Sequence, residues 1–280
     1  MAKPNDYADI SLVDHKPQLN PGAVKQSFSD FLNHPFSILH VDIRSFHHKL
    51  PRLEFLLAEL DINFSCIVIS ETWFSEHEYL NKFFIKGYNL YCRSQPQGGG
   101  GGVCVYVAEK FDATVVDMRL EGAEVMLVRI CCRGRPVFSV LPVYRAPSES
   151  PAAFLADWEA CLPSLPSNSV VVGDLSFDLN HKNQIDCQSL NYLLIMSSNG
   201  FFNIVDTPTR FGIHKISLLD HIFVTNLNSM LSCTIETDVL ADHLPVAWFI
   251  NFDQLSDINK QNKLQKISIT KLDRGMLAEK

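Results

Sequence analysis

The stretch Ser169-Val-Val-Val-Gly-Asp174 decides the fold class of this chain. Residues 170–172 form a continuous β-branched run, which is typical of a strand covered on both faces. Gly173 leaves room for a close backbone approach, and Asp174 then delivers one carboxylate to the rim of a sheet. A strand followed by a turn explains one such segment equally well. The functional interpretation gains weight because several other apolar runs end in the same way.

The composition fits a globular protein of 280 residues, of which 46% are hydrophobic and 20% charged, with one large domain or two small ones. No apolar run reaches the length of a transmembrane helix, and no basic segment with an apolar core opens the chain. We therefore expect no membrane partner and an intracellular protein, nuclear or cytoplasmic, that is not secreted. The net charge of −7 lacks the basic footprint usual for nucleic-acid binders. This argument is weaker for a metal-dependent phosphodiesterase, because bound cations supply positive charge to the phosphate.

The eight cysteines contain no Cys-x-x-Cys pair, and most lie in apolar, strand-like runs. We interpret them as small buried hydrophobic residues in a reducing compartment, and not as zinc ligands or a disulfide framework.

The sequence predicts one folded domain over residues 35–252. A flexible lead-in is expected over 1–34, which is polar and turn-rich, and a polar, lysine-rich linker or tail over 253–280. Helices are predicted at 46–60, 151–162 and 187–199, the second with Ser150 as its cap and Pro151 in its first turn. Strands are predicted at 36–41, 65–70, 83–92, 103–108, 113–117, 123–132, 137–143, 169–174, 216–224, 231–238 and 245–250. Many short strands with few helices indicate an α/β sandwich of two packed sheets flanked by helices.

Polar residues that can take part in catalysis or metal binding follow six of these apolar runs: Asp42, Glu71, Tyr144, Asp174, Asp220 and the pair Asp242-His243. Glutamate and aspartate supply the hard oxygen ligands that Mg²⁺ prefers. A further aspartate can orient or deprotonate a water, and tyrosine and histidine can donate to phosphate oxygens. The set predicts metal-assisted hydrolysis of a phosphodiester.

The same residues lie in motifs that resemble the endonuclease/exonuclease/phosphatase superfamily, and most closely the apurinic-type endonuclease domain of non-LTR (LINE-type) retrotransposons. The motifs come in the family's order across roughly residues 36–252. They are Leu39-His-Val-Asp-Ile-Arg-Ser45, Ser70-Glu-Thr-Trp73, Gly99-Gly-Gly-Gly-Val-Cys-Val-Tyr-Val107, Val143-Tyr-Arg-Ala-Pro147, Val172-Gly-Asp174, Pro208-Thr-Arg210, Ser217-Leu-Leu-Asp-His-Ile-Phe223 and Asp242-His-Leu-Pro-Val246.

The resemblance implies a four-layer, DNase I-like α/β sandwich with two mixed sheets and the site at one edge of both. It implies that Glu71 binds the catalytic Mg²⁺, with Mn²⁺ as the alternative ion, and that Asp174 positions the attacking water. Tyr144 and His243 would contact the scissile phosphate, and Asp220 would orient His243. Asp42 is a further candidate metal ligand, and Asp242 could serve a metal or the water.

Two arginines, Arg145 and Arg210, are candidate phosphate contacts, because arginine suits recognition of a nucleic-acid backbone. A surface salt bridge is the alternative interpretation for each of them.

The expected function is therefore a Mg²⁺-dependent DNA endonuclease that nicks a target strand, a fragment of a non-LTR retrotransposon. In this family such a nick exposes the 3′ hydroxyl that primes reverse transcription. DNA is the expected partner of a monomer without an obligate protein partner.

Two alternatives stand beside the endonuclease. One is a phosphatase of the same superfamily. The other is a catalytically impaired descendant, because Asp42, Ser176 and Ala241 stand where the family usually has Asn, Asn and Ser. Ser176 is a candidate catalytic residue that is shorter than the usual asparagine. Losing one such donor costs a factor of about 10²–10³ in rate.

Overall fold

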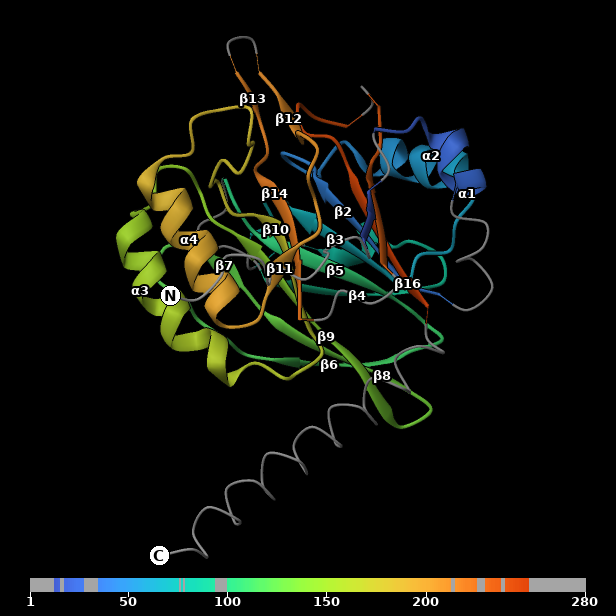
Figure 1. The fold of residues 1–280 in the computed structure, drawn as a ribbon. Coiled ribbons are helices and arrows are strands. Elements are labelled where there is room, and N and C mark those ends of the chain that lie inside the picture. Colours follow the sequence, from blue (N-terminus) through green and yellow to red (C-terminus); the bar gives the residue numbers. More distant parts are fainter. Residues whose placement is uncertain are drawn as a thin grey trace, which may run out of the picture.

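The predicted α/β sandwich is confirmed by the structure, a computed structural model that describes residues 13–15, 18–27, 35–75, 77, 79–93, 100–212, 215–225, 230–237 and 240–251. Two large mixed sheets pack face to face and are flanked by helices (Figure 1). The first sheet has the order β1 (Val13–His15), β15 (Met230–Thr234), β16 (Val246–Asn251), β2 (Pro35–Asp42), β3 (Cys66–Ser70), β5 (Val103–Ala108) and β4 (Tyr88–Arg93).

The second sheet is built around the strand that ends in Gly173-Asp174. Its order is β11 (Phe202–Asn203), β14 (Asp220–Val224), β10 (Ser169–Asp174), β9 (Arg135–Tyr144), β8 (Leu127–Cys132) and β6 (Asp112–Val116), and β7 (Glu124–Val125) also pairs with β9. A separate two-stranded hairpin is formed by β12 (Arg210–Phe211) and β13 (Ile216–Ser217).

Helices form the two outer layers. Helices α1 (Pro21–Ser27) and α2 (Leu50–Leu60) cover the first sheet, and α3 (Pro151–Cys161) and α4 (Cys187–Ser198) cover the second, on opposite sides of Figure 1. Short 3₁₀ turns lie at Leu80–Phe83 and Leu162–Ser164. The predicted cap of α3 is confirmed, because the side chain of Ser150 accepts the N–H of Ala153. No helix in the described part of the chain is long and apolar enough to cross a membrane.

The alternation of side chains along β2 separates two cores. Phe36 and Ile38 pack between the sheets, whereas Leu39 and Val41 pack under α1 and α2. His40 continues the face of Ile38, so the same alternation that builds the core also turns this polar side chain toward the second sheet.

Several sequence predictions differ from the structure in their boundaries. The strand expected over 83–92 is β4, which begins only at Tyr88, and the strand expected over 123–132 is divided between β7 and β8. The helix expected from residue 46 begins at Leu50, because Pro51 is tolerated only in a first turn. The strand expected over 216–224 is divided between β13 and β14. Within the predicted lead-in, β1 pairs with β15 and Val24 of α1 is fully buried, so these residues belong to the packed domain. The predicted tail over 253–280 lies outside the described residues.

Gly173 lies directly against the backbone of β9. Its φ is +151°, and a Cβ atom at this position would lie 1.8 Å from the carbonyl oxygen of Val143. No side chain fits at that distance, so glycine is required for β10 to carry Asp174 past the end of β9.

We expect Gly173→Ala to lower the free energy of unfolding by about 2–4 kcal/mol, because the strands must separate to admit the methyl group. The matched control is Gly200→Ala, since Gly200 also has a positive φ, of +76°, but nothing lies within 4 Å of the place that its methyl group would occupy. The control should lose only about 1–2 kcal/mol, the cost of left-handed alanine. Urea denaturation measures both variants, and equal losses would contradict the close-approach account.

Candidate active site

The candidate site lies at one edge shared by both sheets. Strands β2 and β3 are parallel, as are β9 and β10, so within each pair the carboxyl ends meet at one edge. Asp42 and Asp174 end two of these strands. Strand β14 runs antiparallel to β10 and begins with Asp220 directly opposite Asp174, and His243 lies just before β16, the antiparallel neighbour of β2. Topology therefore collects residues that are far apart in the sequence.

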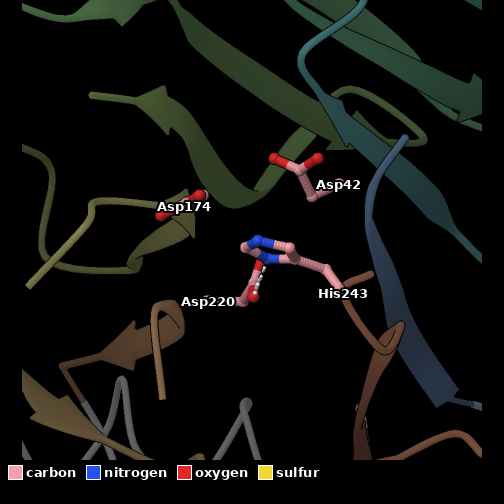
Figure 2. Close-up of side chains that lie close together, drawn as sticks. All are labelled: Asp42, Asp174, Asp220 and His243. Carbon is pink, nitrogen blue, oxygen red and sulfur yellow. Dashed lines mark hydrogen bonds and ion pairs between the residues drawn. The ribbon is translucent and has the colours of Figure 1, made fainter. Parts of the chain in front are cut away.

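Four buried side chains converge at this edge: Asp42, Asp174, Asp220 and His243 (Figure 2). One ligand atom from each lies within 4.8 Å of those of the other three. We call these four residues the acid–histidine group. All four are among the site residues predicted from the sequence.

Asp220 joins the two sheets. Its Oδ2 accepts a hydrogen bond from Nδ1 of His243 at 2.7 Å, and its Oδ1 lies 2.9 Å from Nε2 of His40 on β2. Burial opposes ionisation of Asp220, yet the charge and hydrogen bond of His243 hold its pKa below the ordinary value. Burial alone would lower the pKa of His243, but Asp220 raises it to about 10. The pair is thus a carboxylate and an imidazolium at neutral pH.

Asp174 is held by the residue two positions later. The backbone N–H of Ser176 donates to Asp174 Oδ1 at 2.8 Å, and the Ser176 hydroxyl lies 3.3 Å from the same oxygen. Burial and the charge of Asp220 raise the pKa of Asp174 to about 7. Ser176 therefore lies at the site but directs its side chain to the carboxylate.

Asp42 is the feature that indicates a cation. It is 3% exposed, and its Oδ2 is a buried oxygen without a hydrogen-bond partner. Burial raises its pKa well above the ordinary value, because His243 only partly offsets the lost hydration and the neighbouring carboxyls repel the charge. Such an oxygen is costly unless something positive faces it. Several carboxylate oxygens around one point suit a hard divalent ion, so the residues fit Mg²⁺ or Mn²⁺.

Glu71, the predicted principal metal ligand, lies beside the acid–histidine group but is not one of its four members. Its Oε1 accepts the hydroxyl of Tyr144 at 2.7 Å, and its Oε2 accepts the indole N–H of Trp73 at 3.3 Å. Burial and the charge of Glu71 raise the pKa of Tyr144, so the phenol keeps its proton. Tyr144 and Trp73 thus fix the direction of the Glu71 carboxylate.

The loops around the site have an unusual backbone. Positive φ angles occur at Arg44 (45°), Ser45 (75°), Glu71 (55°), Trp73 (60°) and Ser176 (51°). Non-glycine residues with positive φ are uncommon, and such conformations concentrate at functional sites. Five of the seven among the described residues lie in the loops that follow β2, β3 and β10.

Asp242, which the sequence suggested as a ligand for a metal or the water, instead faces two arginines. Its Oδ2 accepts a hydrogen bond from Nε–H of Arg210 at 3.0 Å, and its Oδ1 lies 3.5 Å from a guanidinium nitrogen of Arg44. Burial raises its pKa, but His243 and Arg210 outweigh this and keep the pKa low. The Arg210 side chain is 42% exposed, so it is partly accessible to solvent.

The Arg145 side chain is turned inward and is not available at the protein surface. It is 2% exposed, and its guanidinium donates to the carbonyls of Leu175, Ser176 and Glu149 at 2.8–3.0 Å. It also stacks over Phe177 at 4.4 Å from the ring centroid. This geometry corrects the predicted phosphate contact: Arg145 positions the loop that carries Asp174.

Two buried residues were missed in the sequence. His40 stands two residues before Asp42 on the same strand face, and this i, i+2 spacing was the available signal. Thr209 lies in the Pro-Thr-Arg motif, and its Oγ1 accepts the backbone N–H groups of Leu219 and Asp220, both at 3.1 Å. Nothing in the local sequence indicates that long-range contact.

No protein-family model and no curated protein sequence matches this chain. Solved structures do match. The endonuclease domain of TRAS1, a telomere-specific non-LTR retrotransposon, has 16% identity and a TM-score of 0.60 over 78% of this chain and 98% of that one. The 3′ phosphatase NExo from Neisseria, bound to a product DNA hairpin, has 14% identity and a TM-score of 0.59 over 76% and 98%.

A third match is the AP endonuclease LMAP from Leishmania major, with 12% identity and a TM-score of 0.65 over 89% of this chain and 96% of that one. The three matches are named as an endonuclease domain, a 3′ phosphatase and an AP endonuclease. The likeness confirms the predicted DNase I-like fold.

The position of Arg145 predicts a stability effect. We expect Arg145→Lys to lower the free energy of unfolding by about 2–4 kcal/mol, because lysine cannot reproduce the planar set of donors and leaves buried carbonyls unsatisfied. The control Arg210→Lys should stay within about 1 kcal/mol of the wild type, since its ion pair is partly exposed. Denaturant titration compares the two. Equal small effects would contradict the structural role of Arg145.

The unpartnered oxygen of Asp42 predicts the response to a cation. Saturating Mn²⁺ should stabilise the protein by about 2–3 kcal/mol at 100 times the dissociation constant. Asp42→Asn should be more stable than the wild type without metal, by about 1–2 kcal/mol, and should respond less to Mn²⁺. Asp242→Asn is the matched control and should be stabilised by Mn²⁺ as much as the wild type, because the Asp242 carboxylate is ion-paired with Arg210 and Arg44. Thermal unfolding with and without Mn²⁺ or EDTA measures this, and an unaltered response of Asp42→Asn would contradict the assignment.

Proposed function

We propose that this chain, which has the fold shared by these nucleases and phosphatases, is a divalent-metal-dependent DNA endonuclease that nicks one strand. The observation that carries the proposal is the acid–histidine group, whose three carboxyls and one imidazole converge at the sheet edge around an unpartnered carboxylate oxygen. Such a set serves hydrolysis of a phosphodiester, where a water must be activated and negative charge must be stabilised.

Asp174 has the role of positioning the attacking water and accepting its proton. Its Oδ1 is fixed by Ser176, which directs the carboxylate, and its burial favours proton acceptance over hydration. The backbone of this loop is in turn fixed by Arg145 through the carbonyls of Leu175 and Ser176.

His243 has the role of stabilising the scissile phosphate. Nδ1 is engaged by Asp220, which keeps the ring protonated and leaves Nε2 to donate to a phosphate oxygen. The preorganised donor is worth most in the transition state, where charge on the phosphate oxygens grows.

A divalent cation, Mg²⁺ or Mn²⁺, held by Asp42 and Glu71 when bound, supplies positive charge for the phosphate and the leaving oxygen. Tyr144 and Trp73 orient Glu71 through the two hydrogen bonds described above. Arg210 and Arg44, both exposed in part beside Asp242, are the groups we assign to flanking phosphates.

DNA is the proposed substrate because two of the matched proteins are named as endonucleases and the Neisseria protein is bound to a DNA hairpin. A retrotransposon origin is supported by the match to TRAS1 and by the motif order in the sequence. The acidic net charge does not oppose DNA binding once a cation occupies the site.

Nicking of supercoiled plasmid with Mg²⁺ or Mn²⁺ tests the proposal. We expect Asp174→Asn and His243→Gln each to reduce the nicking rate by about 10²-fold or more, because each removes one group that acts on the reacting atoms. EDTA should abolish nicking. Glu159→Gln, which neutralises an exposed carboxylate on α3, is the matched control and should leave the rate unchanged. A wild-type nicking rate equal to that of Asp174→Asn with both metals would contradict the proposed endonuclease activity.

The phosphatase alternative is separated by the choice of substrate. A closed circular duplex offers only internal phosphodiesters, whereas an oligonucleotide with a 3′ phosphate offers a terminal phosphomonoester like that handled by a 3′ phosphatase. An endonuclease opens the circle. Release of phosphate from the end, with the circle intact, would favour the phosphatase.

A catalytically impaired descendant is the second candidate, and Ser176 is the observation that favours it. Serine occupies a left-handed conformation with φ of 51°, and its hydroxyl lies against Asp174. Asparagine tolerates this conformation better and reaches farther.

We therefore expect Ser176→Asn to raise the nicking rate about 10-fold or more, in the range that one positioned donor contributes. Ser176→Ala keeps a short side chain in the same backbone and should give no gain. Initial rates on the same plasmid compare the three proteins. An asparagine variant no faster than the wild type would show that Ser176 does not limit the reaction.

A further inference from the structure

Two cysteines face each other across the edge of the first sheet. Cys92 on β4 and Cys104 on β5 are direct partners in the antiparallel register. Both side chains belong to the apolar cluster under α2, where Cys104 is fully buried and Cys92 is partly exposed. Neither cysteine belongs to the acid–histidine group, and the proposed reaction does not use the pair.

The thiols are close enough to interact. Burial, together with the interaction with Cys92, raises the pKa of the Cys104 thiol well above its usual range. Direct partners in an antiparallel pair have Cβ atoms about 4.5–5.5 Å apart. A disulfide needs about 3.5–4.5 Å between the Cβ atoms, and its Cα range of about 4.4–6.8 Å covers such a pair. Since β4 is an edge strand, a small movement of one strand closes the difference.

The arrangement is specific to this pair. In the registers of the described strands, Cys66 stands opposite Val107, Cys131 opposite Pro136, and no other two cysteines oppose each other. Exposed Cys187 lies at the start of α4. Among the described strands, Cys92 and Cys104 are therefore the pair of cysteines placed to react with each other.

We propose that Cys92 and Cys104 form a reversible redox site that is oxidised by hydrogen peroxide to a cross-strand disulfide. The sulfur of Cys92, the partly exposed member of the pair, is oxidised first, giving a sulfenic acid and one water. The Cys104 sulfur then attacks the Cys92 sulfur, the S–S bond forms, and the sulfenic oxygen leaves as a second water. Two thiols lose two electrons and two protons, and one peroxide is reduced to two waters. A dithiol reverses the step by thiol–disulfide exchange.

The bond would fix the two strands beside a loop that supports the candidate active site. Gly101 and Gly102, just before β5, accept the backbone N–H groups of Trp73 and Thr72 at 2.9 and 3.3 Å. Those residues follow Glu71 directly. The redox site therefore lies next to the backbone that holds Glu71, although its formation does not depend on the proposed nuclease activity.

Tryptic mapping tests the proposal, because the sequence places a cleavage site between the two cysteines. Trypsin cuts after Lys86, Arg93 and Lys110, so Cys92 lies in peptide 87–93 and Cys104 in peptide 94–110, each with one cysteine. The folded full chain is treated with a small excess of peroxide, its remaining thiols are blocked in denaturant, and the digest is analysed by mass spectrometry. We expect the two peptides joined, lighter than their sum by two hydrogens, and separated again by dithiothreitol.

Variants make the result decisive. Cys92→Ser, at a partly exposed position, should abolish the joined peptide, and Cys187→Ser should leave its yield unchanged. Recovery of Cys92 as a separate peptide, either unmodified or as sulfinic acid, would overturn the proposal. So would joined peptides that link Cys104 to other cysteines in comparable yield. Circular dichroism of the reduced Cys92→Ser protein confirms that it is folded.

Discussion

The buried carboxylate of Asp220 is the contact on which the candidate site depends. It receives His243 from the loop that leads into β16 and His40 from β2, two strands of the first sheet, while Asp220 itself begins β14 in the second. Three polar side chains with 0–6% exposure would destabilise the interface between two sheets if they were not paired. Paired, they fix how the two sheet edges lie against each other. Removing one partner would leave a buried charge uncompensated, a loss of about 3–5 kcal/mol in comparable pairs.

Around this contact, the molecule keeps negative charge where hydration is poor. Asp42 and Asp174 are buried beside Asp220, and their pKa values are raised by that burial and by mutual repulsion. The imidazolium of His243 offsets part of this charge. The remainder favours a divalent cation, which is also the species that a phosphodiester requires for charge neutralisation. The same arrangement thus costs stability in the free protein and prepares the site for its ligand.

The sequence predicted the sheet strands and their polar ends well, because apolar runs of four to six residues and their boundaries are local properties. Gly173-Asp174 is the clearest example, since the strand, the close approach at Gly173 and the rim carboxylate were all read from six residues. The direction of long side chains was not predictable. Arg145 turns inward onto carbonyls of a loop about 30 residues away, and Asp242 turns to Arg210 instead of the acid–histidine group. Such choices are set by packing between distant segments, which one sequence does not reveal.

The central claim is that Asp42 and Glu71, beside the other members of the acid–histidine group, hold a divalent cation for phosphodiester hydrolysis. Anomalous diffraction from crystals soaked in Mn²⁺ tests it most directly, because the ion is located without reference to activity. The account predicts a peak about 2.0–2.3 Å from a carboxylate oxygen of Asp42, with Glu71 as a second ligand. A well-ordered crystal at saturating Mn²⁺ with no peak at this edge, or with the ion bound only elsewhere, would contradict it.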